Sequence, residues 1–198
     1  SGSHFTTDNF RGSNLLGSDL SGVNFGRSDF EESNLSHVNL TNSVFGSVNL
    51  ERANLTGVNF KTIHLNGINS RGLDLSGTDL SGINFSNSNL RKAKLTNAKL
   101  VGANFTSTRL TGADFRGSDL SNAILRKAFL SKAKFQKAII DGADLTSSDL
   151  SRANLDVTSM TNAVLVETDL SKAKIRLSDL DSTKYSDIQL PETFLPEN

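Results

Sequence analysis

The chain has 198 residues, with 21 Lys or Arg residues balanced by 21 Asp or Glu residues and no cysteine. The lack of cysteine excludes disulfides and thiolate metal sites, and the length allows one or two domains. No apolar run approaches the roughly 20 residues that span a bilayer, and no segment is typical of a signal peptide.

Residues 1–4 are expected to form an N-terminal tail outside the fold. Ser1-Gly2-Ser3 is typical of an expression scar, which leaves open whether a natural targeting segment was removed. The compartment is left open, and a soluble protein of the cytoplasm is the default expectation.

A five-residue repeat runs from Phe5 to Leu195. Of the 39 positions that are multiples of five, 38 carry Leu, Phe, Ile, Met or Tyr, and the exception is Ser70. The residue two before each is Ala, Ser, Thr or Val at 33 of 39 positions, and the residue just before is usually Asn or Asp. Helices repeat every three or four residues and half-buried strands every two. The period of five therefore predicts a chain that coils around two inward-facing positions.

The repeat resembles the motif A(D/N)LXX of the pentapeptide-repeat family, as in residues 53–57 (ANLTG), 113–117 (ADFRG) and 143–147 (ADLTS). The resemblance covers the whole chain and implies an all-β fold, a right-handed, four-sided parallel β-helix with four pentapeptides per 20-residue coil. About ten coils at the usual inter-strand spacing would give a rod about 45 Å long. We expect one uninterrupted domain over residues 5–198.

A 20-residue coil also predicts which side chains stack on one another. One side would carry an aromatic column made of Phe5, Phe25, Phe45, Phe85 and Phe105. Cross-coil ion pairs are expected for Lys94 between Asp74 and Asp114, and for Lys99 between Asp79 and Asp119. Ser70 would lie between Leu50 and Leu90, where its hydroxyl needs a backbone carbonyl or water as a partner. A local defect or bulge is the favoured interpretation of Ser70, with a functional hinge as the alternative.

The charges are unevenly distributed along the chain. Residues 91–140 hold 11 Lys or Arg against two Asp or Glu, whereas acidic residues are in excess on either side. Eight cations flank the column that contains Ser70, and they form the candidate interaction stripe: Arg52, Arg71, Arg91, Lys92, Arg109, Lys132, Arg152 and Lys172. They are either solvated charges that keep a rod soluble or a footprint for an acidic protein, anionic lipid or nucleic acid. Nucleic acid is disfavoured, because the stripe lacks aromatic residues for base stacking beyond Phe129.

Three apolar residues occupy the slot that usually carries Asn or Asp: Ile124, Phe129 and Ile139. We expect them to be exposed as a neighbouring cluster, which would be a candidate partner surface unless the chain tucks them in.

The C-terminus is expected to form a cap around residues 186–198. Pro191 and Pro196 each remove a backbone donor and so blunt the open edge of the last coil. No helix long enough to dimerise is predicted after residue 180, so a monomer or weak end-to-end association is expected.

No catalytic, cofactor-binding or metal-binding residue is predicted. His4, His37 and His64 fall at different phases of the coil, and a zinc site needs three or four converging ligands. No base is placed to activate a Ser or Asp nucleophile, and a filled solenoid offers no enclosed pocket.

Two functions remain in comparison. The first is a non-enzymatic scaffold, a rigid rod that presents side-chain ladders to an unknown protein partner. The second comes from the resemblance, because some pentapeptide-repeat proteins mimic DNA and bind DNA gyrase, as in quinolone resistance or toxin immunity. Those relatives are acidic dimers, whereas this chain is neutral with a basic middle, so the scaffold is preferred.

Overall fold

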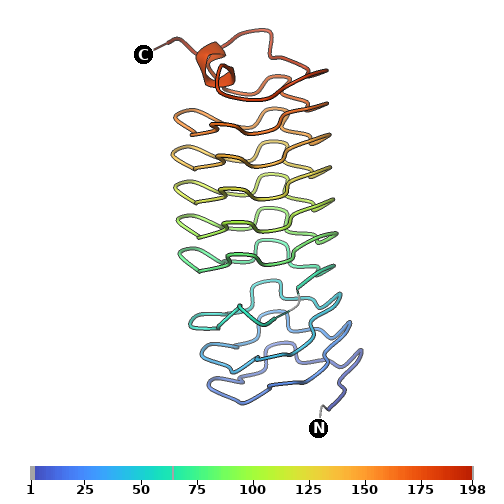
Figure 1. Ribbon diagram of the computed structural model, residues 1–198. Helices are drawn as coiled ribbons and strands as arrows, with labels where there is room; N and C mark the ends of the chain where they lie inside the picture. Colours follow the sequence, from blue (N-terminus) through green and yellow to red (C-terminus); the bar gives the residue numbers. More distant parts are fainter. Residues whose placement is uncertain (1–2, 64, 198) are drawn as a thin grey trace.

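The computed structural model describes residues 3–63 and 65–197, and the chain winds into a rod of stacked coils (Figure 1). Parallel bridges join residues 20 apart, from the pair of His4 with Asn24 to the pair of Asp169 with Gln189. The residues that precede the fifth-position side chains form these bridges, so a regular coil carries four of them. Successive coils therefore lie one above the other in register, and the right-handed winding stays a prediction.

The bridges are isolated pairs, and within the described residues they do not extend into strands. A corner every five residues leaves too little extended chain between corners for a regular strand. The described residues contain one helix, the 3-10 helix η1 at Leu177–Leu180. None of them forms a helix with the length and apolar character needed to cross a lipid bilayer.

Each corner is a tight turn that the repeat sequence stabilises. After Phe105, the amide of Thr108 donates to the Phe105 carbonyl at 3.0 Å, and Ser107 has a φ of 56°. Asn104 Oδ1 accepts from the amide of Thr106 at 2.9 Å, which is the local hydrogen bond that favours Asn and Asp at turns. The preference for Asn or Asp before each apolar residue is thereby explained.

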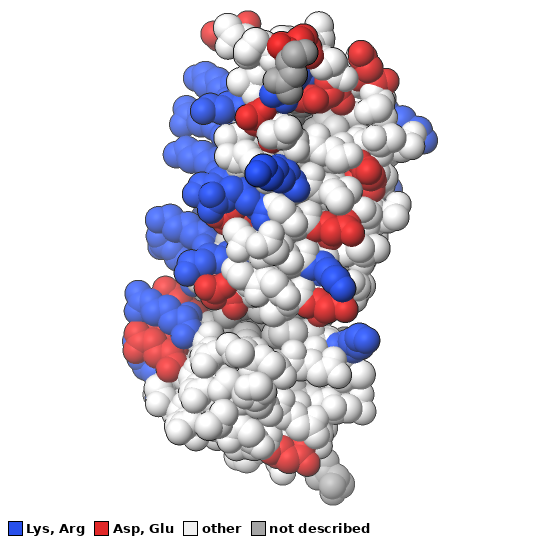
Figure 2. All heavy atoms as spheres, turned by 90° about the vertical axis from the view of Figure 1, so that its left-hand side faces the viewer, with Lys and Arg blue, Asp and Glu red and all other residues white. Residues whose placement is uncertain are grey.

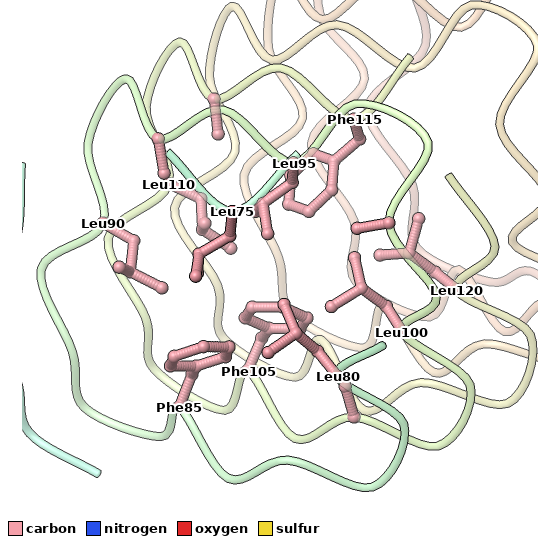
Figure 3. Packing of buried hydrophobic residues seen from close by; sticks show 14 of the residues in the cluster. Leu75, Leu80, Phe85, Leu90, Leu95, Leu100, Phe105, Leu110, Phe115 and Leu120 are labelled. Carbon is pink, nitrogen blue, oxygen red and sulfur yellow. The ribbon is translucent and has the colours of Figure 1, made fainter. Parts of the chain in front are cut away.

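The fifth-position side chains meet along a common interior axis (Figure 3). Leu75, Leu95 and Phe115 lie above one another in one column, and each is at most 1% exposed. The predicted aromatic column forms in two runs, with ring centroids 5.2 Å apart for Phe25–Phe45 and 5.5 Å apart for Phe85–Phe105.

The terminal coils are less well buried than the middle. Phe5, Tyr185 and Leu190 are 38%, 53% and 45% exposed, although the Phe5 ring still stacks on Phe25 in the predicted column, with ring centroids 5.9 Å apart. A terminal coil has a neighbour on one side only, as in other solenoids.

The C-terminal segment closes over the last coil. Helix η1 interrupts the pentapeptide path at Leu177, before residue 186, where the cap was predicted to begin. Beyond it, Pro191 is buried and the amide of Leu195 donates to the Ile175 carbonyl at 2.8 Å. Together these residues cover the end of the interior (Figure 1).

Candidate functional site

Eight exposed cations gather at one corner of the rod, seven in the corner turns and Arg109 on the adjoining face, and we refer to them as the basic ladder. Its members are Arg52, Arg71, Arg91, Lys92, Arg109, Lys132, Arg152 and Lys172. Figure 2 shows Lys and Arg side chains stacked along one edge of the rod, above a lower part with few charges. The predicted stripe is thus placed on one corner, and its role in binding stays a prediction.

Five members of the ladder occupy equivalent corner positions in different coils: Arg52, Lys92, Lys132, Arg152 and Lys172. Their φ angles lie between 58° and 61°, in the left-handed region that costs a side-chain-bearing residue more than glycine. Glycine takes this same position in the two intervening coils, as Gly72 and Gly112. The corner can therefore be built with or without a charge.

Only the lower end of the ladder is neutralised. Arg52 Nη1 lies 2.8 Å from Glu32 Oε1 and 3.9 Å from Glu31 Oε1. Among the described residues, the other seven members have no carboxylate oxygen within 4.0 Å of their charged nitrogens. The positive charge of the upper ladder is therefore open to an incoming partner.

Cations on the other faces are more often paired across coils. The predicted pair of Lys94 with Asp74 forms at 3.1 Å. Lys134 lies 3.9 Å from Asp114, whereas within the described residues Lys99 makes no ion pair with Asp79 or Asp119.

Asp114 forms ion pairs with two cations, Arg116 and Lys134. Burial raises the pKa of its carboxyl, but hydrogen bonds from the Arg116 side chain and amide, together with the charges of Arg116 and Lys134, lower the pKa below its ordinary value. Arg116 Nε and Nη2 donate to the two carboxylate oxygens at 2.8 and 2.6 Å. This arrangement holds a salt bridge in place and leaves no free acid for chemistry.

Arg109 and Phe129 extend the basic ladder into a shallow groove. They form a bridge with each other, and Phe129 is 50% exposed. With Asn69, Asn87 and Asn89 they line an open groove of about 400 Å³. The sequence analysis named Phe129 as the one aromatic residue beside the stripe, and the structure brings it next to Arg109.

The other two apolar candidates are not gathered with Phe129. Ile124 and Ile139 are each 40% exposed, but they lie in different bridge columns, with Asp144 and Ser159 in the coil above them. The three side chains therefore lie on three faces of one coil and do not form a single patch.

The described residues contain no group of three or more His, Asp or Glu side chains that could hold a metal ion. His4 and His37 are exposed in different columns, and His64 lies outside the described residues. The open grooves offer surfaces for contact with another molecule.

Comparison of folds identifies other solved repeat proteins. Two trypsin-treated forms of QnrB1, a plasmid-mediated fluoroquinolone resistance protein, are 18% and 17% identical, with TM-scores of 0.56 and 0.57. The alignments cover 96% of this chain and 90% and 91% of theirs. A pentapeptide repeat protein from the thylakoid lumen of Arabidopsis thaliana is 30% identical over 52% of this chain and 72% of its own, with a TM-score of 0.45. No curated protein matches the chain by sequence.

The family model described as pentapeptide repeats matches the sequence in eight copies. The matches cover residues 1–27, 28–69, 71–106, 103–142, 113–152 and 143–181, which together make up most of the chain. The stacked 20-residue coils and the buried fifth positions agree with this match. The chain therefore belongs to the pentapeptide-repeat family.

Proposed function

We propose that the protein is a non-enzymatic interaction scaffold whose basic ladder binds an acidic surface of a partner protein. The observation that carries this proposal is that six exposed cations on one corner, and Arg109 on the adjoining face, have no carboxylate partner among the described residues. The filled interior keeps the rod stiff, so the positions of these charges are fixed before binding.

The spacing of the ladder strengthens its field. Lys132, Arg152 and Lys172 belong to consecutive coils, which puts their backbones about 4.8 Å apart per coil. This is shorter than the Debye length of about 8 Å at physiological ionic strength, so their potentials add. A linear array of positive potential fits a partner that presents aligned Asp and Glu side chains.

Glycine substitutions test the ladder without disturbing the corner. Lys92→Gly with Lys132→Gly should keep or raise stability, because glycine adopts a positive φ at little cost. Binding to surface-immobilised poly-L-glutamate should weaken severalfold and lose part of its salt dependence. The matched control is Lys127→Gly with Lys137→Gly, which removes two lysines with φ of 56° and 62° from other corners.

The two double variants should behave differently if the ladder is the binding site. Equal loss of binding in both would show that only net charge matters and would contradict the proposal. Stronger binding of wild type to duplex DNA or to anionic vesicles than to poly-L-glutamate, at equal ionic strength, would also contradict it.

A second candidate function is DNA mimicry directed at DNA gyrase. The fold likeness to a fluoroquinolone resistance protein favours it, with a TM-score of 0.56 over 96% of the chain. The balanced charge and the basic ladder oppose it, because a DNA mimic needs a negative field. A gyrase supercoiling assay should show neither inhibition nor protection from a fluoroquinolone, and either effect would favour this second candidate.

A further inference from the structure

Among the described residues, no amide from Leu40 to Leu65 donates a backbone hydrogen bond to the coil above, and we name the part of this interruption between residues 53–57 and residues 74–78 the seam. In the regular stack, the amides of Leu75 and Gly77 donate to the carbonyls of Lys94 and Thr96 in the next coil, both at 2.8 Å. Within the described residues, the equivalent amides of Leu55 and Gly57 make no backbone hydrogen bond to the coil above. Figure 1 shows the coils separating there, where the trace passes from cyan to green.

A cleft of about 630 Å³ opens at the seam, and its walls are the two unpaired coil edges. Neither Asn54 with Asp74 nor Asn59 with Asp79 forms the bridge that the 20-residue register would give, although all four are described. This volume is within the range of ordinary ligand sites. The seam is therefore a cleft in the wall of the rod.

The sequence supplies a physical cause for the separation. Larger side chains replace the usual small inward residue in the coils that flank the seam: Ile63, Ile68, Leu73 and Ile83. All four are buried, with at most 5% exposure. Extra methylene groups in a packed interior force the backbone to move, so these coils cannot close on one another along their whole length.

One column remains joined across the interruption. The amide of Asn69 donates to the Val48 carbonyl at 3.0 Å, and the amide of Ser70 donates to the Asn89 carbonyl at 2.8 Å. Ser70 Oγ accepts from the amide of Leu50 at 3.1 Å, in place of a backbone carbonyl. Bridges between described residues are thus missing on at least two faces, and this column holds the coils together.

The two lips of the cleft present complementary main-chain groups. The regular register would direct the Leu55 and Gly57 amides and the Ala53 carbonyl upward, and the Asp74 amide and carbonyl downward. An extended chain between them could pair with both edges, as a strand does when it adds to an open sheet edge. The nearby charges are already partnered, Arg52 with Glu32 and Asp74 with Lys94, so they do not favour a charged ligand.

We propose that the seam binds an extended peptide segment of a partner protein, which inserts as an additional rung and pairs through its main chain with both lips. Ala53 and Leu55 line the cleft and are each 5% exposed, while Asn54 and Ser76 on the rim are exposed. The segment therefore places small or apolar side chains inward and polar ones outward. This site is separate from the upper basic ladder, so either proposal can fail without the other.

A peptide copied from the chain itself is the most direct probe. Residues 91–98 (RKAKLTNA) already pair with residues 73–77 in the regular stack, where the amide of Lys94 donates to the Leu73 carbonyl at 2.9 Å. Titrated into the isotope-labelled full chain, this peptide should shift the amide resonances of Leu55, Gly57 and Asp74 saturably. The control peptide is N-methylated at the positions of Lys94 and Leu95, which removes donors for both lips, and it should produce no such shifts.

The proposal is overturned if the seam amides do not shift, or if both peptides shift them equally. Shifts confined to residues 5–20, at the open edge of the first coil, would also overturn it.

A second variant tests the cause of the cleft. Leu73→Ala with Ile83→Ala should let the coils approach, and the peptide-induced shifts should be lost. Ile188→Ala changes the same inward slot far from the seam and should leave the shifts intact. If the double variant retains the shifts, the assignment of the cleft to these side chains is wrong.

Discussion

At the scale of single residues, Ser70 shows how one polar atom is accommodated in an apolar column. It is fully buried, and its hydroxyl accepts a hydrogen bond from the amide of Leu50. Ser70→Ala would leave that amide without an acceptor, and we expect a loss of about 1 to 3 kcal/mol in the free energy of unfolding. Urea unfolding followed by circular dichroism measures this change.

Ser148 provides the matched control for this prediction. It is also buried, but Ser148 Oγ has no hydrogen-bond partner among the described residues. Ser148→Ala should therefore be neutral or slightly stabilising. Equal destabilisation by the two substitutions would show that the bond from Leu50 to Ser70 contributes nothing specific.

The sequence predicted where Ser70 lies but not how its hydroxyl is satisfied. The hydroxyl oxygen accepts from the amide of Leu50, which the interruption of the ladder leaves without its usual carbonyl acceptor. The signal for that interruption was present in the same coil, as Ile63, Ile68 and Leu73 in a slot that is otherwise small. The period of five predicts which single side chains point inward. The combined effect of several large inward side chains on the spacing of the coils depends on three-dimensional packing.

At the scale of repeats and turns, the ion pairs of Asp114 within its own turn and with the next coil make the stability of the molecule depend on acid pH. The folded pKa of Asp114 lies below its unfolded value, because the hydrogen bonds and charges of Arg116 and Lys134 outweigh the cost of burial. The stabilising contribution is present above the unfolded pKa of about 3.9 and is lost as pH falls through the folded pKa. Asp114→Asn should therefore flatten the decline of thermal stability below about pH 4.

Thermal unfolding from about pH 6 to pH 2 checks this expectation. Arg116→Gln should also reduce the acid sensitivity, because it removes the bidentate donor that lowers the pKa of Asp114. An Asp114→Asn profile parallel to that of the wild type would contradict the assignment.

The sequence predicted the stacking of the coils better than the structure of the C-terminal segment. Aligning residues that are 20 apart correctly placed Lys94 beside Asp74. The same alignment would have placed Glu32 beneath Arg52. It gave no sign of helix η1, because a short 3-10 helix over Leu177–Leu180 depends on contacts beyond the repeat. Long-range packing decides the terminal segments, where the period is weakest.

At the scale of the whole molecule, the rod combines a continuous interior with a wall that is open at one seam. Each coil contacts mainly its neighbours, so stability is close to a sum of local interfaces. The loss of inter-coil hydrogen bonds at the seam therefore weakens one interface between coils without unfolding the other coils. The sequence predicted the interior, and its expectation of an unbroken stack is wrong at the seam.

Amide hydrogen exchange of the native full chain, measured residue by residue, tests this arrangement most directly. Amides in the intact ladder, such as those of Leu95 and Phe105, should be protected about 100-fold or more above the amides of Leu55, Gly57 and Asp74. Protection at the seam equal to that of Leu95, or no protection at fifth positions anywhere in the middle coils, would contradict the account.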